Sequence, residues 1–168
     1  MTEPLAGTEQ KQHFMESGEA AFEEAIDAVI ARARHTLHVF DVDLTRGGYS
    51  SLRRYEALQE FLLRSRSNRL TLVLHDIDFL TTRCPRLMSL LKAYSHAIAI
   101  HQTHEHARAA SDPLLIADAT HFIHRFHSRG ARFLLALNDP AGAYPLEERF
   151  GQLLQASHPA VFATTLGL

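Results

Sequence analysis

Apolar residues in the first part of the chain recur at helical spacing and then gather into short continuous runs. Between Phe14 and Arg34 they stand three or four positions apart, for example at Phe22 and Ile26, and charged residues occupy the other sides. This spacing predicts a helix over 14–34. The run TLHVFDV at 36–42 is short and rich in branched and aromatic residues, which is typical of a strand.

The alternation of helix and strand continues to about residue 101 and then changes. Beyond that point short apolar runs follow one another with no helical segment between them, and an amphipathic segment closes the chain. The further elements predicted are helices over 52–62, 85–94 and 144–157, and strands over 69–75, 97–102, 112–118, 121–127 and 132–139. Strands that alternate with helices favour right-handed crossovers, so we expect an α/β fold with a mixed, mostly parallel sheet flanked by helices on both faces.

Both ends of the chain differ from this central part. Residues 1–13 are polar and we expect them to form a flexible leader, with 14–168 as a single domain. The tail 158–168 is apolar for a terminus, and we expect it to pack on the domain or on another subunit.

Composition narrows the function classes. The 168 residues are 46% hydrophobic and 21% charged, and no apolar run approaches the roughly 20 residues of a membrane span. The start of the chain lacks the features of a signal peptide, so we expect a cytoplasmic protein. The net charge of −2 argues against generic binding of duplex nucleic acid.

Paired carboxylates stand where two of the predicted strands end. Asp41 and Asp43 follow the first strand, and Asp76 and Asp78 follow the second, so both pairs should share the edge of the sheet where ligands usually bind. Acidic residues are also common at strand ends because they form turns and cap helices. DVDLT resembles the first motif of haloacid dehalogenase-like phosphotransferases, which implies Asp41 as nucleophile and Asp43 as general acid/base with magnesium.

A second resemblance covers more of the chain. From Phe22 to Ser157 the order of elements resembles one half of a phospholipase D-like domain, whose strand motif H-x-K-x4-D is followed by an Asn or Glu near a proline. Here SDPLLIAD aligns with the first motif and ends at Asp118, and NDP at Asn138 aligns with the last. The catalytic histidine and lysine positions of the motif are occupied by Ser111 and Pro113.

The phospholipase D resemblance implies a small bacterial half-module of uncharacterised function. Serine and proline cannot replace the phosphorus-attacking imidazole or the charge-balancing ammonium group, which favours a pseudoenzyme over an enzyme. Because the family builds one site from two halves, it also implies a homodimer. We therefore expect a non-catalytic module that binds a phosphate-containing ligand or a protein partner. No cofactor is expected, and magnesium enters only in the alternative hydrolase that uses Asp41 and Asp43.

The chain is rich in histidine, with 12 residues of this type. His104 and His106, just before the degenerate motif, are candidates for a relocated nucleophile and hence for a phosphodiesterase. His121, His124 and His127 lie in a predicted strand and would alternate between its faces, so we expect no metal site there.

The remaining candidate is a cationic pocket formed by Arg125 with His104, His106 or His124. Arginine can make two hydrogen bonds to one anion, which suits a phosphate or a carboxylate. The alternative is an internal ion pair between Arg125 and Asp118 or Asp112. The candidate ligand-binding residues are Ser111, Asp118, His124, Arg125, Ser128 and Asn138.

Overall fold

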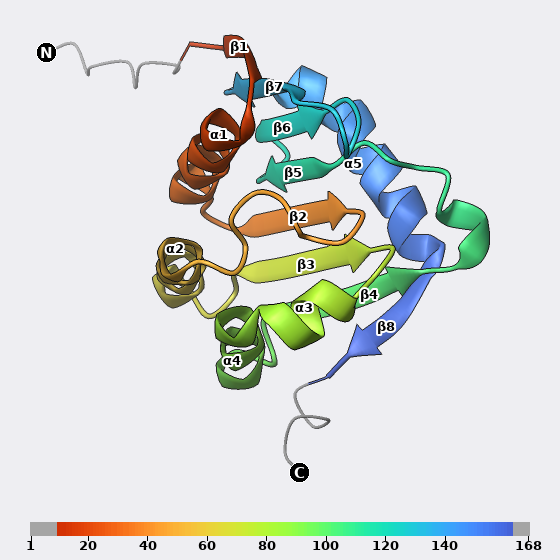
Figure 1. The fold of residues 1–168 in the computed structure, drawn as a ribbon. Coiled ribbons are helices and arrows are strands. Elements are labelled where there is room, and N and C mark those ends of the chain that lie inside the picture. The colour runs from red at the N-terminus through yellow and green to blue at the C-terminus, as the bar shows by residue number, and fades with distance from the viewer. Residues whose placement is uncertain (1–9, 163–168) are drawn as a thin grey trace, which may run out of the picture.

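The computed structural model describes residues 10–162, which form one sheet with helices on both sides (Figure 1). Within that range the sheet has eight strands in the order β1-β7-β6-β5-β2-β3-β4-β8. The strands are β1 Gln12–Ser17, β2 Thr36–Asp41, β3 Arg69–Leu74, β4 Ile98–Thr103, β5 Leu114–Ala117, β6 His121–Arg125, β7 Arg132–Leu137 and β8 Ser157–Val161. The helices are α1 Glu19–Arg32, α2 Leu52–Arg64, α3 Asp78–Arg83, α4 Pro85–Ala93, the short 3₁₀ helix η1 Glu105–Ala107, and α5 Pro140–Gln155.

The sheet is mixed, as predicted, but it is not mostly parallel. Only the β2–β3 and β3–β4 pairings of the described strands are parallel, and every other neighbouring pair is antiparallel. The reason is the run β5, β6 and β7, which is joined by short turns that can link only antiparallel strands. The tight β5–β6 turn uses Asp118 and Ala119, which both have positive φ.

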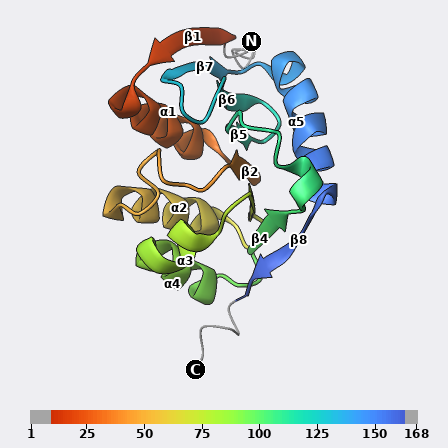
Figure 2. The ribbon, with the colours of Figure 1, turned by 45° about the vertical axis from the view of Figure 1, so that its right-hand side comes forward.

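Helices cover both faces of the sheet, which confirms that part of the prediction. Helices α1 to α4 lie on one side and α5 lies on the other (Figures 1 and 2). Side chains alternate along β2 accordingly, so Val39 packs in the core beneath α1 and α2 while Phe40 packs with Phe150 of α5. The central strands are therefore buried on both faces.

The ends of the chain hold the two edge strands, which the sequence pattern did not predict. The helix predicted from Phe14 was wrong at its start, because 12–17 pair with β7 and the helix begins at Glu19, after Gly18 with its φ of 103°. Strand β1 thus includes two residues of the expected leader, whose first nine residues lie outside the described part. Residues 157–161 pair with β4, so this part of the tail packs on the domain as expected, and 163–168 lie outside the described residues.

No helix in the described part of the chain is both long and apolar enough to cross a bilayer.

Candidate functional site

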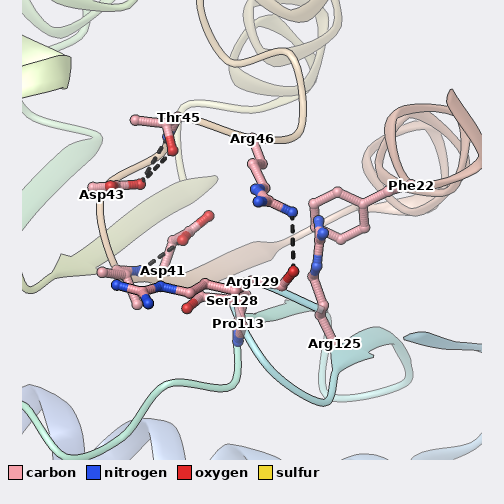
Figure 3. Close-up of a pocket in the computed structure, with 10 residues that line it drawn as sticks. Phe22, Asp41, Asp43, Thr45, Arg46, Pro113, Arg125, Ser128 and Arg129 are labelled. Carbon is pink, nitrogen blue, oxygen red and sulfur yellow. Dashed lines mark hydrogen bonds between the residues drawn. The ribbon is translucent and has the colours of Figure 1, made fainter. Parts of the chain in front are cut away.

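A polar cavity of about 260 Å³ opens at the carboxyl end of β2 (Figure 3). It lies where β2 ends beside the start of antiparallel β5, so loops from several elements meet there. Its lining residues come from α1, the end of β2 and the following loop, the approach to β5, and the end of β6 with its turn. They are Phe22, Asp41, Val42, Asp43, Thr45, Arg46, Pro113, Arg125, Ser128 and Arg129.

The loop after β2 is held against α1 by a glycine and a buried arginine. Gly47 has a φ of 92°, and a Cβ at this position would lie 2.8 Å from Ile26 Cδ1 and 2.9 Å from Tyr49 Cε2. Arg54 of α2 is buried and donates 2.9 Å to the Gly47 carbonyl while pairing with Asp27 of α1. Only a residue without a side chain fits here, and this close packing places the adjacent Arg46 at the cavity.

Asp41 lies at the buried end of the cavity, and the residue is 6% exposed. Its Oδ1 accepts a hydrogen bond of 2.6 Å from the Val42 amide. The pKa of Asp41 is raised from 3.8 to about 7, mainly by burial and also by the nearby Asp43 charge, against the opposing effects of the Val42 hydrogen bond and the Arg125 charge. Asp43 itself accepts from the amide and hydroxyl of Thr45 at 3.0 and 2.8 Å, which shapes the loop as an Asx turn.

Arg125 is the largest fully buried side chain of the domain and lines the same cavity. Its Nη2 donates to Glu19 Oε1 at 2.7 Å and its Nε donates to the Gly130 carbonyl at 2.7 Å. The guanidinium lies 4.6 Å from the centre of the Phe22 ring. Its Nη1 is buried and has no hydrogen-bond partner within residues 10–162. Arg125 does form an internal ion pair, as the alternative interpretation predicted, but its partner is Glu19 and neither Asp118 nor Asp112.

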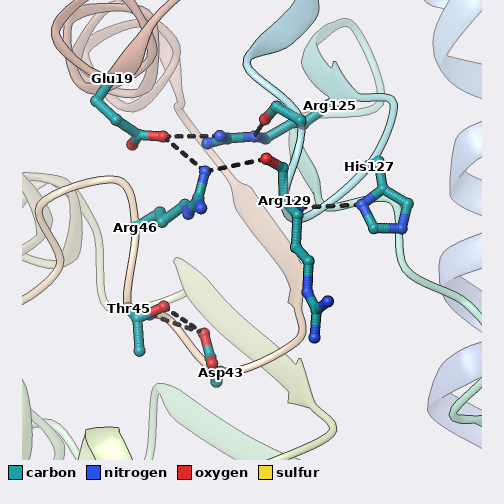
Figure 4. Close-up of polar contacts among 8 residues, drawn as sticks. Glu19, Asp43, Thr45, Arg46, Arg125, His127 and Arg129 are labelled. Atoms are coloured by element: carbon teal, nitrogen blue, oxygen red, sulfur yellow. Dashed lines mark hydrogen bonds and ion pairs between the residues drawn. The ribbon is translucent and has the colours of Figure 1, made fainter.

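Two further arginines stand at the opening of the cavity (Figure 4). Arg46 donates to Glu19 Oε1 at 3.3 Å and to the Arg129 carbonyl at 3.5 Å. The Arg129 amide donates to His127 Nδ1 at 3.1 Å, and its exposed guanidinium forms no ion pair with any described carboxylate. Three cationic groups therefore surround one cavity.

The cavity brings together four of the residues singled out from the sequence: Asp41, Asp43, Arg125 and Ser128. Ser111 lies next to them, because its carbonyl accepts a hydrogen bond of 2.6 Å from the Ser128 amide.

Asp118, the acid that matches the phospholipase D motif, lies at the other end of β5. Its carboxylate accepts from three successive amides, Arg34 at 2.8 Å, His35 at 2.7 Å and Thr36 at 2.9 Å. This arrangement ties the β5–β6 turn to the link between α1 and β2. Asp118 is thus a structural residue here and does not line the cavity.

The remaining candidates also lie elsewhere. His124 Nε2 is 2.9 Å from Asp112 Oδ2, Asn138 bonds to His121 and the Gln10 carbonyl, and His104 stacks on His106 and His158.

The described part of the chain contains no group of three or more His, Cys, Asp or Glu side chains that could hold a metal ion. Asp41 and Asp43 line the cavity without a third acid, and Lys92, the lysine that the haloacid dehalogenase analogy would need, lies in the last turn of α4 and does not line it. Neither observation favours the magnesium alternative.

The sequence interpretation missed Arg46, Arg129, Thr45 and Glu19. For Thr45 and Arg46 the one available signal was the pair of glycines after Arg46, which indicated a turn in the loop that follows Asp43, and nothing in the sequence pointed to Arg129 or Glu19.

Comparison with solved structures shows a phospholipase D-like fold. Nuc from Salmonella typhimurium, a phospholipase D family member, has a TM-score of 0.65 and 11% identity, with 90% of this chain and 99% of that chain covered. NucT from Helicobacter pylori has a TM-score of 0.60 and 10% identity, covering 90% of this chain and all of that one. TrmBL2, an archaeal chromatin protein, gives 0.68 and 9% identity over 90% of this chain, which spans 56% of the TrmBL2 chain.

A search of curated proteins gives no match. A family model described as a domain of unknown function, DUF7931, matches residues 18–162. This range contains α1, the cavity and every strand except β1. The chain therefore belongs to the DUF7931 family.

Proposed function

We propose that this domain binds a phosphate-containing anionic ligand in the Asp41–Arg125 cavity and does not cleave it through a histidine nucleophile. The observation that carries the proposal is Arg125, 1% exposed, with a buried Nη1 that lacks an acceptor beside the cavity it lines. A buried cationic donor without a partner costs free energy, so such groups usually mark an unmet contact. A ligand oxygen would provide the missing acceptor.

The other polar residues suit the same ligand. Arg46 and Arg129 add positive charge at the opening, and Thr45 and Ser128 contribute hydroxyl groups. Guanidinium groups bind phosphate oxygens with defined geometry because their donors are planar and always charged. A cavity of about 260 Å³ has room for a phosphate group and little more of a ligand.

The lining residues also support the non-catalytic part of the proposal. They include no histidine and no lysine, and Ser111 and Pro113 occupy the positions that the phospholipase D motif gives to those residues. Asp41 is half protonated near pH 7 because its pKa is about 7, which makes it a weak nucleophile.

A homodimer, a protein partner and a cytoplasmic location stay predictions. Light scattering coupled to gel filtration tests the first: a monomeric mass across the micromolar range would contradict it.

Calorimetric titration with inorganic phosphate tests the proposed function. Replacing Arg129 with Gln should weaken binding about fivefold, the effect of about 1 kcal/mol that a solvent-accessible ion pair contributes. Arg83→Gln is the matched control, since Arg83 is exposed and lies on α3 outside the cavity. Equal affinity of the wild-type protein, R129Q and R83Q would contradict binding at this cavity.

A hydrolysis assay tests whether the domain is catalytic. Neither a p-nitrophenyl phosphomonoester nor a phosphodiester should be cleaved, with magnesium or with chelator. Magnesium-dependent turnover abolished by Asp41→Asn would instead support the haloacid dehalogenase-like alternative. Chelator-resistant turnover abolished at His104 or His106 would support a relocated nucleophile.

A further inference from the structure

Glu19 does not line the cavity, but it forms ion pairs with two of the three arginines that do. Its Oε1 accepts from Arg125 Nη2 at 2.7 Å and from Arg46 Nη1 at 3.3 Å (Figure 4). The residue stands in the first turn of α1, and its side chain is 48% exposed. An ion pair that is half exposed adds little to folding stability, so a purely structural role does not account well for this shared contact.

We propose that the cavity selects a singly charged oxyanion over a doubly charged one, and that Glu19 sets this selectivity. The inference rests on the proposed anion-binding function and specifies the ligand of the same site. The ligand group is a phosphodiester or a carboxylate, which both carry one negative charge at neutral pH.

The charge balance of the site gives the first argument. Three guanidinium groups each carry one positive charge, those of Arg46, Arg125 and Arg129. The carboxylates of Glu19 and Asp43 carry two negative charges, so the net charge of the site is +1 when Asp41 is protonated. One bound negative charge makes this group of residues neutral. A second would leave net negative charge in a partly buried cavity, where Coulomb energies are larger than in water.

The hydrogen bonds of the arginines give the second argument. Glu19 accepts one of the two Nη2 hydrogens of Arg125 and the Gly130 carbonyl accepts its Nε hydrogen, while Nη1 has no acceptor within residues 10–162. Arg46 uses its Nη1 for Glu19 and for the Arg129 carbonyl. Because the Glu19 carboxylate accepts from both Arg125 and Arg46, it offsets part of the positive charge that these two guanidinium groups present to a ligand, which favours an anion of lower charge.

Calorimetric titration of three anions with the wild-type protein and Glu19→Gln tests the proposal. The probes are sulfate as the doubly charged anion, and dimethyl phosphate and acetate as the singly charged ones. All titrations run at about pH 6, where Asp41, with its pKa of about 7, is mostly protonated. Glu24→Gln is the matched control, because Glu24 is exposed on the same helix and lies outside the cavity.

The wild-type protein should bind at least one of the singly charged anions more tightly than sulfate, and the tighter of the two identifies the ligand group. E19Q should bind sulfate about tenfold more tightly but the singly charged anions no more than about threefold more tightly. E24Q should match the wild-type protein.

Three results would overturn the selectivity while leaving the anion site intact: a wild-type preference for sulfate, equal gains for all anions in E19Q, or weaker binding of all anions in E19Q. The last result would mean that Glu19 only positions Arg125. If neither protein binds any of the three anions, the proposed function itself fails.

Discussion

Replacing Asp41 with asparagine should stabilise the domain in a way that depends strongly on pH. Asparagine keeps the shape of the side chain and an acceptor for the Val42 amide, which lies 2.6 Å from Oδ1, but it cannot ionise. Burial raises the pKa of Asp41 from 3.8 to about 7, so the folded protein keeps a proton that the unfolded chain loses between these values. This contribution to stability is fully present below pH 3.8 and is lost as the pH rises through about 7.

The size of the effect follows from the pKa difference. One pKa unit corresponds to about 1.4 kcal/mol, so a shift from 3.8 to about 7 gives an upper bound of about 4 kcal/mol for ionising the buried carboxyl group. At about pH 8 the variant should be more stable than the wild-type protein by about 2 to 4 kcal/mol, which is roughly 5 to 15 °C in Tm. At about pH 4 the two proteins should differ little.

Urea unfolding of both proteins across this pH range measures the difference. Asp76→Asn is the control, because Asp76 is exposed at the end of the neighbouring strand β3, and its stability difference should hardly change with pH. A constant difference between D41N and the wild-type protein would refute the reasoning. So would destabilisation of D41N at about pH 8, since this would mean that the ionised carboxylate forms a favourable pair with Arg125.

Three further predictions concern the loop, the motif acid and ligand binding. Gly47→Ala should lower the stability by about 2 to 4 kcal/mol in urea unfolding and weaken phosphate binding, because a Cβ would lie 2.8 Å from Ile26 at a φ of 92°. Asp118→Ala should cost about 2 to 4 kcal/mol, since three amides lose their acceptor, but calorimetry should find phosphate affinity unchanged. Sulfate affinity should fall as the pH rises through about 7, where Asp41 ionises beside the ligand, and D41N should abolish this fall in the same titration.

Much of the fold was predictable because its central elements carry strong local patterns. Strands β2 to β4 are short apolar runs, and the helices between them show amphipathic spacing. The edge strands carry no such pattern, because β1 is exposed along most of its length and β8 contains Pro159, so their structure depends on pairing with β7 and β4. The prediction of a mostly parallel sheet was wrong, because the direction in which two strands pair depends on the segment that connects them and not on the strands themselves.

The candidate site was predictable only where it touches a strand end. Asp41 ends β2 and stood out as a polar group that follows an apolar run, whereas Arg125, which ends β6, was singled out as the arginine of a possible cationic pocket. Arg46 and Arg129 are exposed loop residues without periodic surroundings, and although the glycines after Arg46 indicate a turn, nothing local marks either arginine as part of a site. Glu19 meets Arg125 across 106 positions of sequence, a contact that requires the whole sheet to be assembled.

The position of Arg125 supports the proposal that this phospholipase D-like fold binds an anion although Ser111 and Pro113 occupy the histidine and lysine positions of the motif. Strands β5 and β6 pair antiparallel, and the Arg125 amide donates 3.0 Å to the Pro113 carbonyl, so Arg125 lies beside the positions that Ser111 and Pro113 occupy. A guanidinium can hold a phosphate oxygen, but it stays protonated at any physiological pH and cannot attack phosphorus or act as a base. Under the proposed function, the cavity therefore binds a phosphate group through charge and hydrogen bonds, and Arg125 supplies no nucleophile.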